Sequence, residues 1–286
     1  MRSTLKVLFA PIMLLGFNGV AVWIDMVNLS LYWLIPLLIA AVAFAAVVER
    51  IIPYHPGWNE GPGEFRRDFV HAVVNIAIII FLTLVLRPGH GIWPETWPVW
   101  AQLLFAIVIV DAGLSFAHYL SHRVNFLWKI HAAHHSPTRM YAFNGLLQHP
   151  FHQAFEIIVG GTIVIAMGMP HEIGLLVGFA VVIQFLLQHS NADMRIGPLK
   201  YLLAVAPVHR RHHTREYDGY GANFGFFTNL WDYMLGTLDL GERTRVGETE
   251  VGVSDPAYPK TYMAQFRHPF AREASPAARP ARETAP

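Results

Sequence analysis

The stretch PVWAQLLFAIVIVDAGLSFAHYLSH, residues 98–122, decides the fold class of this chain. Most of its residues before His118 are apolar, and a helix of about 20 apolar residues is what crosses a hydrocarbon core of about 30 Å. The stretch then ends in two histidines, His118 and His122. The whole chain is 53% hydrophobic and 14% charged, whereas about 25% of the residues in a soluble domain are charged. We therefore expect an integral membrane protein with histidines at a helix end.

Other apolar runs predict the remaining helices. Together with the first, they place spanning helices at about 7–24, 29–48, 69–87 and 98–117. The run 155–188 is interrupted at Gly168 and Pro170, which predicts a hairpin of two shorter helices that either dips into the membrane or crosses it twice. The expected fold is an all-α integral membrane protein with about four transmembrane helices, this re-entrant or spanning hairpin, and a cytoplasmic helical cap carrying the histidine clusters. We expect one catalytic domain over 1–270 and a disordered tail over 271–286.

Basic residues predict the orientation in the membrane. Arg2 and Lys6 precede the first apolar run, and Arg50, Arg66 and Arg67 lie between the second and the third. Because Lys and Arg accumulate in cytoplasmic loops, we expect the N-terminus and the histidine-rich part to face the cytoplasm. The first run lacks a cleavage site and is expected to stay as a helix. We expect a bacterial inner membrane, with an endoplasmic reticulum membrane as the alternative.

The composition excludes several classes of site. The chain has no cysteine, so disulfides, iron–sulfur clusters and thiolate zinc sites are absent. Its net charge of +1 is spread along the chain and does not indicate nucleic-acid binding. Histidine is the unusual residue: 12 of the 16 lie between His118 and His213. The function is therefore expected to depend on these histidines.

Three histidine clusters carry helical spacing. They are His118 with His122, then His131, His134 and His135, and finally His209, His212 and His213. Residues three and four apart lie on one face of a helix, so each cluster can present its imidazoles to a common ion. Single histidines are more often structural than ligands, but two copies of the pattern HxxHH favour a metal site. Eight imidazoles exceed what one ion can use, and imidazole suits iron, zinc, copper and nickel alike, which predicts two ions of undetermined element.

The clusters and their surroundings resemble the fatty acid hydroxylase superfamily, within it the sterol desaturase branch. The resemblance runs from about residue 111 to 238 through these elements in order: Asp111, His118-Tyr-Leu-Ser-His122-Arg123, Leu127-Trp128-Lys129-Ile130-His131-Ala-Ala-His134-His135-Ser136, His149-Pro150, Gln188-His189-Ser190-Asn191, Gly197-Pro198-Leu199, Pro207-Val208-His209-Arg210-Arg211-His212-His213, Asn223-Phe224-Gly225 and Trp231-Asp232. The sequence departs from the sterol branch at His152, where an acidic residue is frequent.

The resemblance implies a site and a reaction. Nine residues would be iron ligands: His118, His122, His131, His134, His135, His189, His209, His212 and His213. Five more would be ligands or would support the ligands: His149, Asp111, Asn191, Asn223 and Asp232. Members of the superfamily use two iron ions, O₂ and external electrons to hydroxylate or desaturate sterols, fatty acyl chains or ether lipids.

The partners implied are a lipid from the bilayer and a separate electron-transfer protein, such as a ferredoxin, a cytochrome or an NAD(P)H-linked reductase. Arg210, Arg211 and Arg215 are candidates to dock an acidic donor or to contact anionic lipid headgroups. The rival from another class is a histidine-rich metal transporter. Transport sites, however, usually lie near the middle of the membrane on broken helices, whereas these clusters follow the apolar runs.

Overall fold

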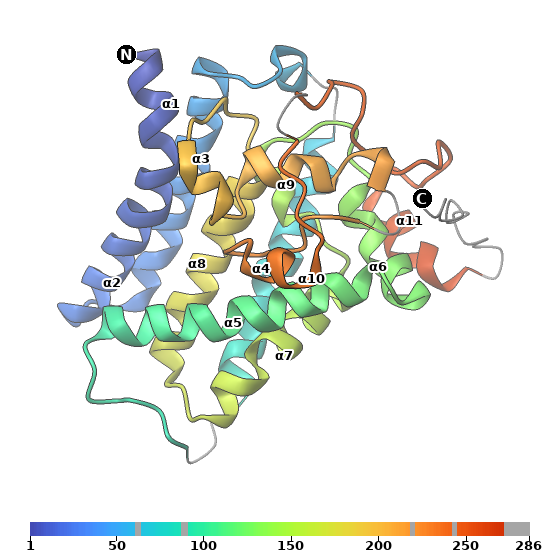
Figure 1. Ribbon diagram of the computed structural model, residues 1–286. Coiled ribbons are helices and arrows are strands. Elements are labelled where there is room, and N and C mark those ends of the chain that lie inside the picture. Colours follow the sequence, from blue (N-terminus) through green and yellow to red (C-terminus); the bar gives the residue numbers. More distant parts are fainter. Residues whose placement is uncertain (61–63, 87–90, 218–220, 242–244, 272–286) are drawn as a thin grey trace.

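A computed structural model describes residues 1–60, 64–86, 91–217, 221–241 and 245–271. Within these residues the regular structure is helical, apart from isolated β-bridges. The helices labelled in Figure 1 are α1 (Arg2–Pro11), α2 (Asn18–Met26), α3 (Leu34–Ile51), α4 (Phe65–Val85), α5 (Val99–Ser121), α6 (Asn125–His135), α7 (Pro150–Ala166), α8 (His171–His189), α9 (Ala206–His212), α10 (Leu230–Leu235) and α11 (Tyr262–Arg267). The predicted all-α fold is therefore confirmed, and the predicted tail from residue 272 lies outside the described residues.

Among the described residues, five helices are long and apolar enough to cross a membrane. They are Arg2–Met26, Leu31–Ile51, Phe65–Val85, Val99–Ser121 and His171–His189. The first is continuous because a π-helical stretch, Ile12–Phe17, joins α1 to α2. Four of the five overlap the runs predicted from the sequence. The chain is thus a multi-pass membrane protein by the length and composition of its helices.

The fifth candidate span comes from the predicted hairpin. Residues 167–170 separate α7 from α8, and Gly168 adopts a positive φ of 90° in this turn, a conformation that glycine adopts without strain. Of the two helices, only α8 is long enough to count as a span, whereas α7 is a shorter apolar helix. Most of α8 is buried inside the molecule, while the other four candidates expose most of their length. A helix buried all round is apolar on every face, and α8 is therefore the central helix of the bundle.

Helix α5 runs across the bundle instead of along it. In Figure 1 the segment α1–α2 and the helices α3, α4 and α8 lie side by side, and α5 crosses in front of them toward α6. It packs against α7, and the two backbones approach closely where a Cβ on Gly113 would lie 2.6 Å from Cα of Gly160. The crossing carries His118 and His122 from the apolar bundle to the base of α6.

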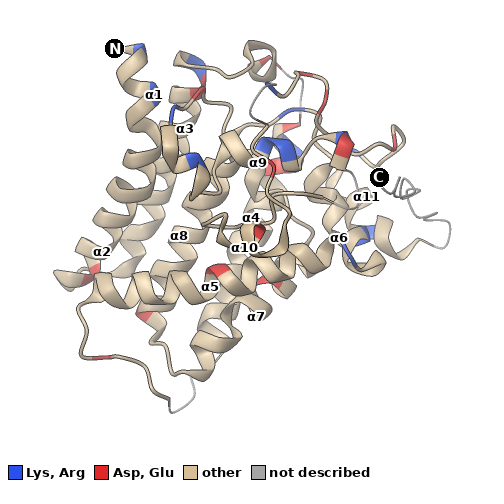
Figure 2. Cartoon of the chain, in the orientation of Figure 1, with Lys and Arg blue, Asp and Glu red and all other residues tan. Residues whose placement is uncertain are grey.

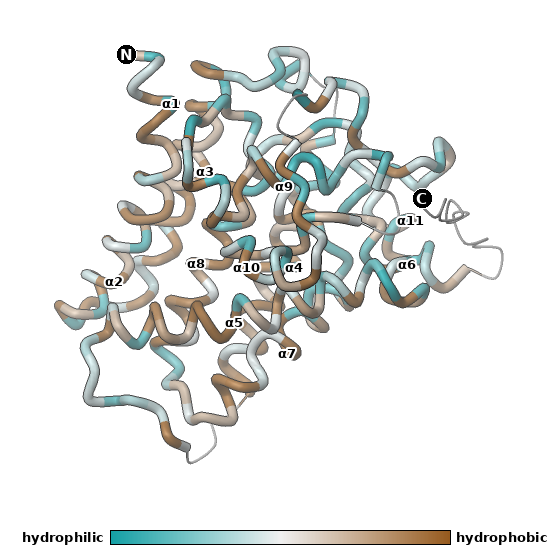
Figure 3. The backbone as a smooth tube through the Cα atoms, in the orientation of Figure 1, coloured by the Kyte–Doolittle hydropathy of each residue, from teal (hydrophilic) through white to brown (hydrophobic). Residues whose placement is uncertain are grey.

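Polar residues gather at one end of the bundle. Lys and Arg lie mainly near the N-terminus, α9 and α6 in Figure 2, and the helices below them are hydrophobic in Figure 3. The acidic residues at the opposite end include Asp25 in α2, Glu95 before α5 and Glu172 in the first turn of α8. The bundle therefore has a basic end, which carries α6 and α9, and an opposite end.

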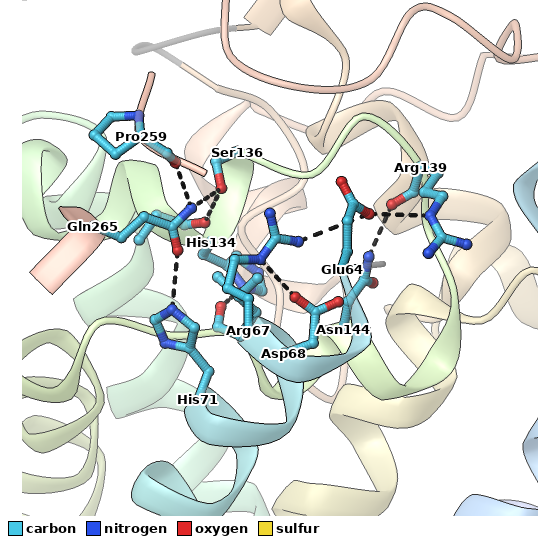
Figure 4. Close-up of polar contacts among 12 residues, drawn as sticks. Glu64, Arg67, Asp68, His71, His134, Ser136, Arg139, Asn144, Pro259 and Gln265 are labelled. Carbon is cyan, nitrogen blue, oxygen red and sulfur yellow. Dashed lines mark hydrogen bonds and ion pairs between the residues drawn. The ribbon is translucent and has the colours of Figure 1, made fainter. Parts of the chain in front are cut away.

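The C-terminal part of the described chain closes over α6. Gln265 of α11 is fully buried, accepts a hydrogen bond from His71 of α4, and donates to the hydroxyl of Ser136 and the carbonyl of Pro259 (Figure 4). Ser136 directly follows His135 at the end of α6. This latch joins α4 to the segment that carries the second histidine cluster.

Candidate metal centre

Nine histidines from four helices meet between the bundle and the basic end. His118 and His122 come from the end of α5, His189 from the end of α8, and the two triplets from α6 and α9. All nine side chains are at most 5% exposed. Helix ends bring histidines together here because the apolar part of each helix remains in the bundle. The nine are the same histidines that the sequence predicts as ligands, and their binding of metal stays a prediction.

The nine imidazoles form two groups. Within each group, one ring nitrogen from every member lies within 4.8 Å of the others. The five-histidine group contains His118, His122, His131, His135 and His212, and the four-histidine group contains His134, His189, His209 and His213. The groups adjoin, since the rings of His135 and His213 stack with centroids 4.4 Å apart. Two metal ions could therefore be held side by side.

Backbone carbonyls orient rings of the five-histidine group. His118 donates from Nδ1 to the carbonyl of Phe224 at 3.2 Å, and His212 donates from Nδ1 to the carbonyl of Ala222 at 2.6 Å. A proton on Nδ1 leaves the lone pair on Nε2 free for a metal. Both carbonyls belong to the loop before α10. This loop therefore fixes the tautomer of two candidate ligands from different helices.

The four-histidine group is oriented by another segment. His134 donates from Nδ1 to the carbonyl of Leu147 at 2.9 Å, and His189 donates from Nδ1 to Oδ1 of Asn144 at 3.3 Å. Both partners belong to the chain between α6 and α7, which packs against α8. The inward-facing nitrogen is again Nε2. The two groups thus share one orientation but depend on different supports.

The inward nitrogens have the spacing of metal ligands. Nε2 of His118 lies 2.8 Å from Nε2 of His212, and the pair His134 and His189 is 3.1 Å apart. The pairs within the triplets measure 3.1 Å for His131 and His135 and 3.0 Å for His209 and His213. Two imidazole nitrogens about 2.1 Å from one ion at a right angle would be about 3.0 Å apart. The donor set therefore fits a metal ion in each group.

Unpaired nitrogens support the same fit. His122 has no hydrogen-bond partner at either ring nitrogen. A buried polar atom without a partner costs about 1–3 kcal/mol, and coordination removes this cost at a ligand nitrogen. Burial lowers the pKa of His134 to about 4, and burial together with neighbouring imidazoles holds the pKa of His135 well below its usual value. The rings are therefore neutral at pH 7, the form that binds metal.

Three polar residues predicted near the site act through the loop at 222–228. Asp111 accepts hydrogen bonds from the backbone of Phe227 and the hydroxyl of Thr228, at 2.7 and 2.6 Å. Asp232 accepts from the backbone of Phe224 at 2.7 Å, and Asn223 donates to the carbonyls of Val208 and Asp239. The carboxylates therefore hold the loop that orients His118 and His212, and they accept hydrogen bonds from its backbone instead of from an imidazole.

Two further candidates lie apart from both groups. His149 caps α7 by accepting from the backbone of Phe151, and its ring stacks on Phe266. Asn191 donates to the carbonyl of His55 and to the side chain of Asn59. Both residues therefore tie segments of the chain together instead of facing the inward nitrogens.

The expected docking role of Arg210 is wrong. This residue is only 3% exposed and donates to the carbonyls of Ser190 and Ala192, so its guanidinium cannot meet a partner protein. The reason is the helical period of α9, which turns Arg210 inward between the ligand positions. Arg211 pairs with Asp239, and Arg215 remains exposed.

Sequence reasoning missed the residues that support the rings. The carbonyls of Leu147, Ala222 and Phe224 carry no side-chain signal, and Asn144 lies in a short 3₁₀ turn, Ala142–Leu146. His152 lies against His131 with ring centroids 4.3 Å apart and faces Glu156 at 3.7 Å. A glutamate within an apolar run, one turn after a histidine, is the one signal that would have indicated this pair.

Comparison with known proteins places the chain in a family. Residues 103–237 match the fatty acid hydroxylase family, and this region contains both histidine groups. Residues 103–237 of the chain therefore form a fatty acid hydroxylase domain. The superfamily predicted from the sequence is thereby confirmed.

Relatives in this superfamily act on different lipids. The chain is 29% identical to the ornithine lipid hydroxylase OlsE of Rhizobium tropici over 94% of its own length and 84% of that protein. It is 28% identical to the alkylglycerol monooxygenase of Danio rerio over 51% of its length and 31% of that protein. It is 25% identical to the very-long-chain aldehyde decarbonylase GL1-6 of rice, over 65% of its length and 31% of that protein. No solved structure matches the chain significantly.

Proposed function

We propose that this protein is a membrane-bound di-iron oxygenase that hydroxylates or desaturates a lipid, with O₂ as cosubstrate and electrons from a separate protein. The observation that carries the proposal is the division of nine buried histidines into two adjoining groups. Its relatives are named for the hydroxylation of ornithine lipids and for alkylglycerol monooxygenase activity. We therefore place the substrate among polar membrane lipids of this kind.

The residues of the chain have definite tasks in this function. Iron, when bound, would supply the activation of O₂ that an unactivated C–H bond requires. Carbonyl partners keep the proton on Nδ1 of His118, His134 and His212, so that Nε2 faces the ions. Burial excludes bulk water from the ligands, which protects a reactive centre from side reactions.

Metal analysis with a paired variant tests this function. We expect about two irons per chain in protein purified in detergent from iron-supplied cells, since nine imidazoles exceed the needs of one ion. The variant His212→Ala/His213→Ala removes one ligand from each group and should lose iron while its helical content is kept. With O₂ and a reductant, the wild-type protein should add oxygen to, or remove hydrogen from, an ornithine lipid or an alkylglycerol, as measured by mass spectrometry.

Two results would contradict this function. The first is an absence of bound metal in the wild-type protein, and the second is a metal content that the variant does not change. Either result would instead favour the alternative function of a histidine-rich metal transporter.

We further propose that the basic end faces the cytoplasm of a bacterial inner membrane. Lys and Arg gather at the end that carries α6 and α9 (Figure 2), in accord with their enrichment on the cytoplasmic side. Because the chain has no cysteine, a single cysteine at exposed Thr249 or Glu95 can report the side. A membrane-impermeant thiol reagent applied from the periplasm should label Glu95→Cys and spare Thr249→Cys, and the reverse labelling would overturn this orientation.

A further inference from the structure

A narrow apolar cavity lies between α4, α5, α7 and α8. Its volume is about 80 Å³, and its walls include Ile79, Val110, Ile157 and Val181, one from each helix. The few polar side chains of the lining include Gln153 and His171. An apolar cavity of this kind does not hold ordered water, which leaves an apolar ligand as its natural occupant.

The cavity approaches the candidate metal centre at one end, without any of the nine histidines in its lining, and extends toward the opposite end of the bundle. At the near end, Gln153 follows His152, whose ring lies against that of His131, and Phe185 lies one turn before His189. At the far end, the lining includes Pro170 at the start of α8. Bound there, a ligand would have one end beside the metal centre and the other deep in the bundle.

The dimensions of the cavity select a linear chain. From Gly174 to Phe185, both in the lining, α8 rises by about 17 Å at about 1.5 Å per residue. One leaflet of a hydrocarbon core of about 30 Å is about 15 Å deep, so a single lipid tail has a matching length. The lining follows α8 over this length between α4, α5 and α7, an elongated shape that favours an extended chain.

Glycines form part of the wall. A Cβ on Gly178 would lie 3.1 Å from Cγ2 of Ile79, and one on Gly174 would lie 2.9 Å from Cγ2 of Thr83. Side chains at these positions of α8 would have to displace α4 or enter the cavity. The width of the cavity therefore depends on these two glycines.

We propose that this cavity holds one linear hydrocarbon chain of the lipid substrate, with its tail directed away from the metal centre, and that Gly174 and Gly178 set the chain that fits. The inference rests on the proposed oxygenase function and narrows its substrate to lipids with straight acyl or alkyl chains. It assigns a selectivity role to residues distant from every candidate ligand.

Crosslinking tests the occupant without requiring activity. An alkyl lipid with a diazirine near the end of its tail, in proteoliposomes, should label peptides from 174–185 of α8 in the wild-type protein. The variant Gly178→Leu should lose most of this label. Gly19→Leu is the matched control, because Gly19 is exposed in α2 and a Cβ there meets nothing within 4 Å. Label confined to lipid-facing residues such as Ile39, or stronger labelling of α8 by a sterol diazirine, would overturn the proposal.

Chain-length profiles test the selectivity. Each methylene that a hydrophobic pocket cannot accommodate costs about 10- to 200-fold in kcat/KM. With substrates that share a headgroup, Gly178→Leu should lower turnover of the longest chains at least ~10-fold relative to the shortest, whereas Gly19→Leu keeps the wild-type profile. An unchanged profile in a Gly178→Leu protein that keeps its iron would overturn the proposal. A wild-type protein without iron or lipid oxidation would instead refute the oxygenase, and the crosslinking result would still decide the occupant.

Discussion

The two histidine groups differ in how many rings they contain and in what holds the rings. The five-histidine group depends on carbonyls of Ala222 and Phe224, in a loop held by Asp111 and Asp232. The four-histidine group depends on the segment between α6 and α7, which packs on the central helix α8. The first group thus has one more histidine and is held by a loop that Asp111 of α5 and Gln188 of α8 fix in place, whereas the second has fewer histidines and a different supporting segment. We expect them to respond differently to the same kind of change.

Removal of one candidate ligand should have the largest effect on iron content, and the effect should differ between the two groups. His212 and His213 are neighbours in sequence but belong to different groups. The variant His213→Ala leaves three imidazoles in its group and is expected to lose that ion, whereas His212→Ala leaves four and should retain a more weakly bound ion. Iron per chain after dialysis against a chelator measures both.

A second pair of variants controls for this ligand prediction. Adding His135→Ala to His212→Ala removes two members of the five-histidine group and should empty only that group, whereas adding it to His213→Ala should affect both groups. Equal iron loss in the two single variants, together with equal loss in the two double variants, would show that the nine histidines do not act as two groups.

The division into groups could not be read from the sequence, although the ligands could. The pattern HxxHH predicts three imidazoles on one turn, and both triplets do lie at helix ends. Successive residues of a helix are rotated by about 100°, so His134 and His135 face different sides and enter different groups. Which side meets which ion depends on how α5, α8 and α9 pack, and periodicity does not contain that information.

The course of α5 illustrates the same limit. Its length and hydropathy make it a candidate membrane span, but they do not contain its direction across the bundle or the close approach of Gly113 to Gly160. The carbonyl supports of the rings were equally hidden, because every residue has a carbonyl. The candidate ligand side chains could thus be predicted from the sequence, whereas the carbonyls that orient them could be identified only from the structure.

Lowering the pH tests a residue of the four-histidine group in a second way. Burial lowers the pKa of His134, in the four-histidine group, to about 4, against a hydrogen bond to Leu147 that raises it. The unfolded chain binds a proton below a pKa of about 6.5, while the folded state resists protonation. Stability of the metal-free protein should therefore fall as the pH drops from about 6.5 to about 4, by about 3 kcal/mol for this residue.

Thermal unfolding of metal-free protein in detergent measures this pH dependence. The variant His134→Asn is the control, since asparagine does not titrate, and its unfolding temperature should fall less steeply over the same pH range. A variant as acid-sensitive as the wild-type protein would show that His134 does not titrate in this window.

The smallest effect is expected from substitutions at residues that hold the histidine rings in place and are not candidate ligands themselves. Asp232→Asn weakens the acceptor that holds the backbone of Phe224 and Gly225, and should reach the five-histidine group only through the loop. Substitutions behind the ligands typically weaken metal binding by about 10- to 100-fold. Asn144→Ala should do the same to the four-histidine group by freeing Nδ1 of His189.

The rate at which a chelator removes iron distinguishes the two supports. Competition with a chelator should release about one iron per chain early in each variant. Adding His135→Ala and His212→Ala empties the five-histidine group beforehand. These two changes should therefore abolish the early release in Asp232→Asn but preserve it in Asn144→Ala. Asp255→Asn, a change at a partly exposed residue that bonds within its own turn, should leave release unchanged. If Asp232→Asn instead released iron from the four-histidine group, the loop before α10 would support both ions, and the separate supports inferred from the hydrogen bonds would be wrong.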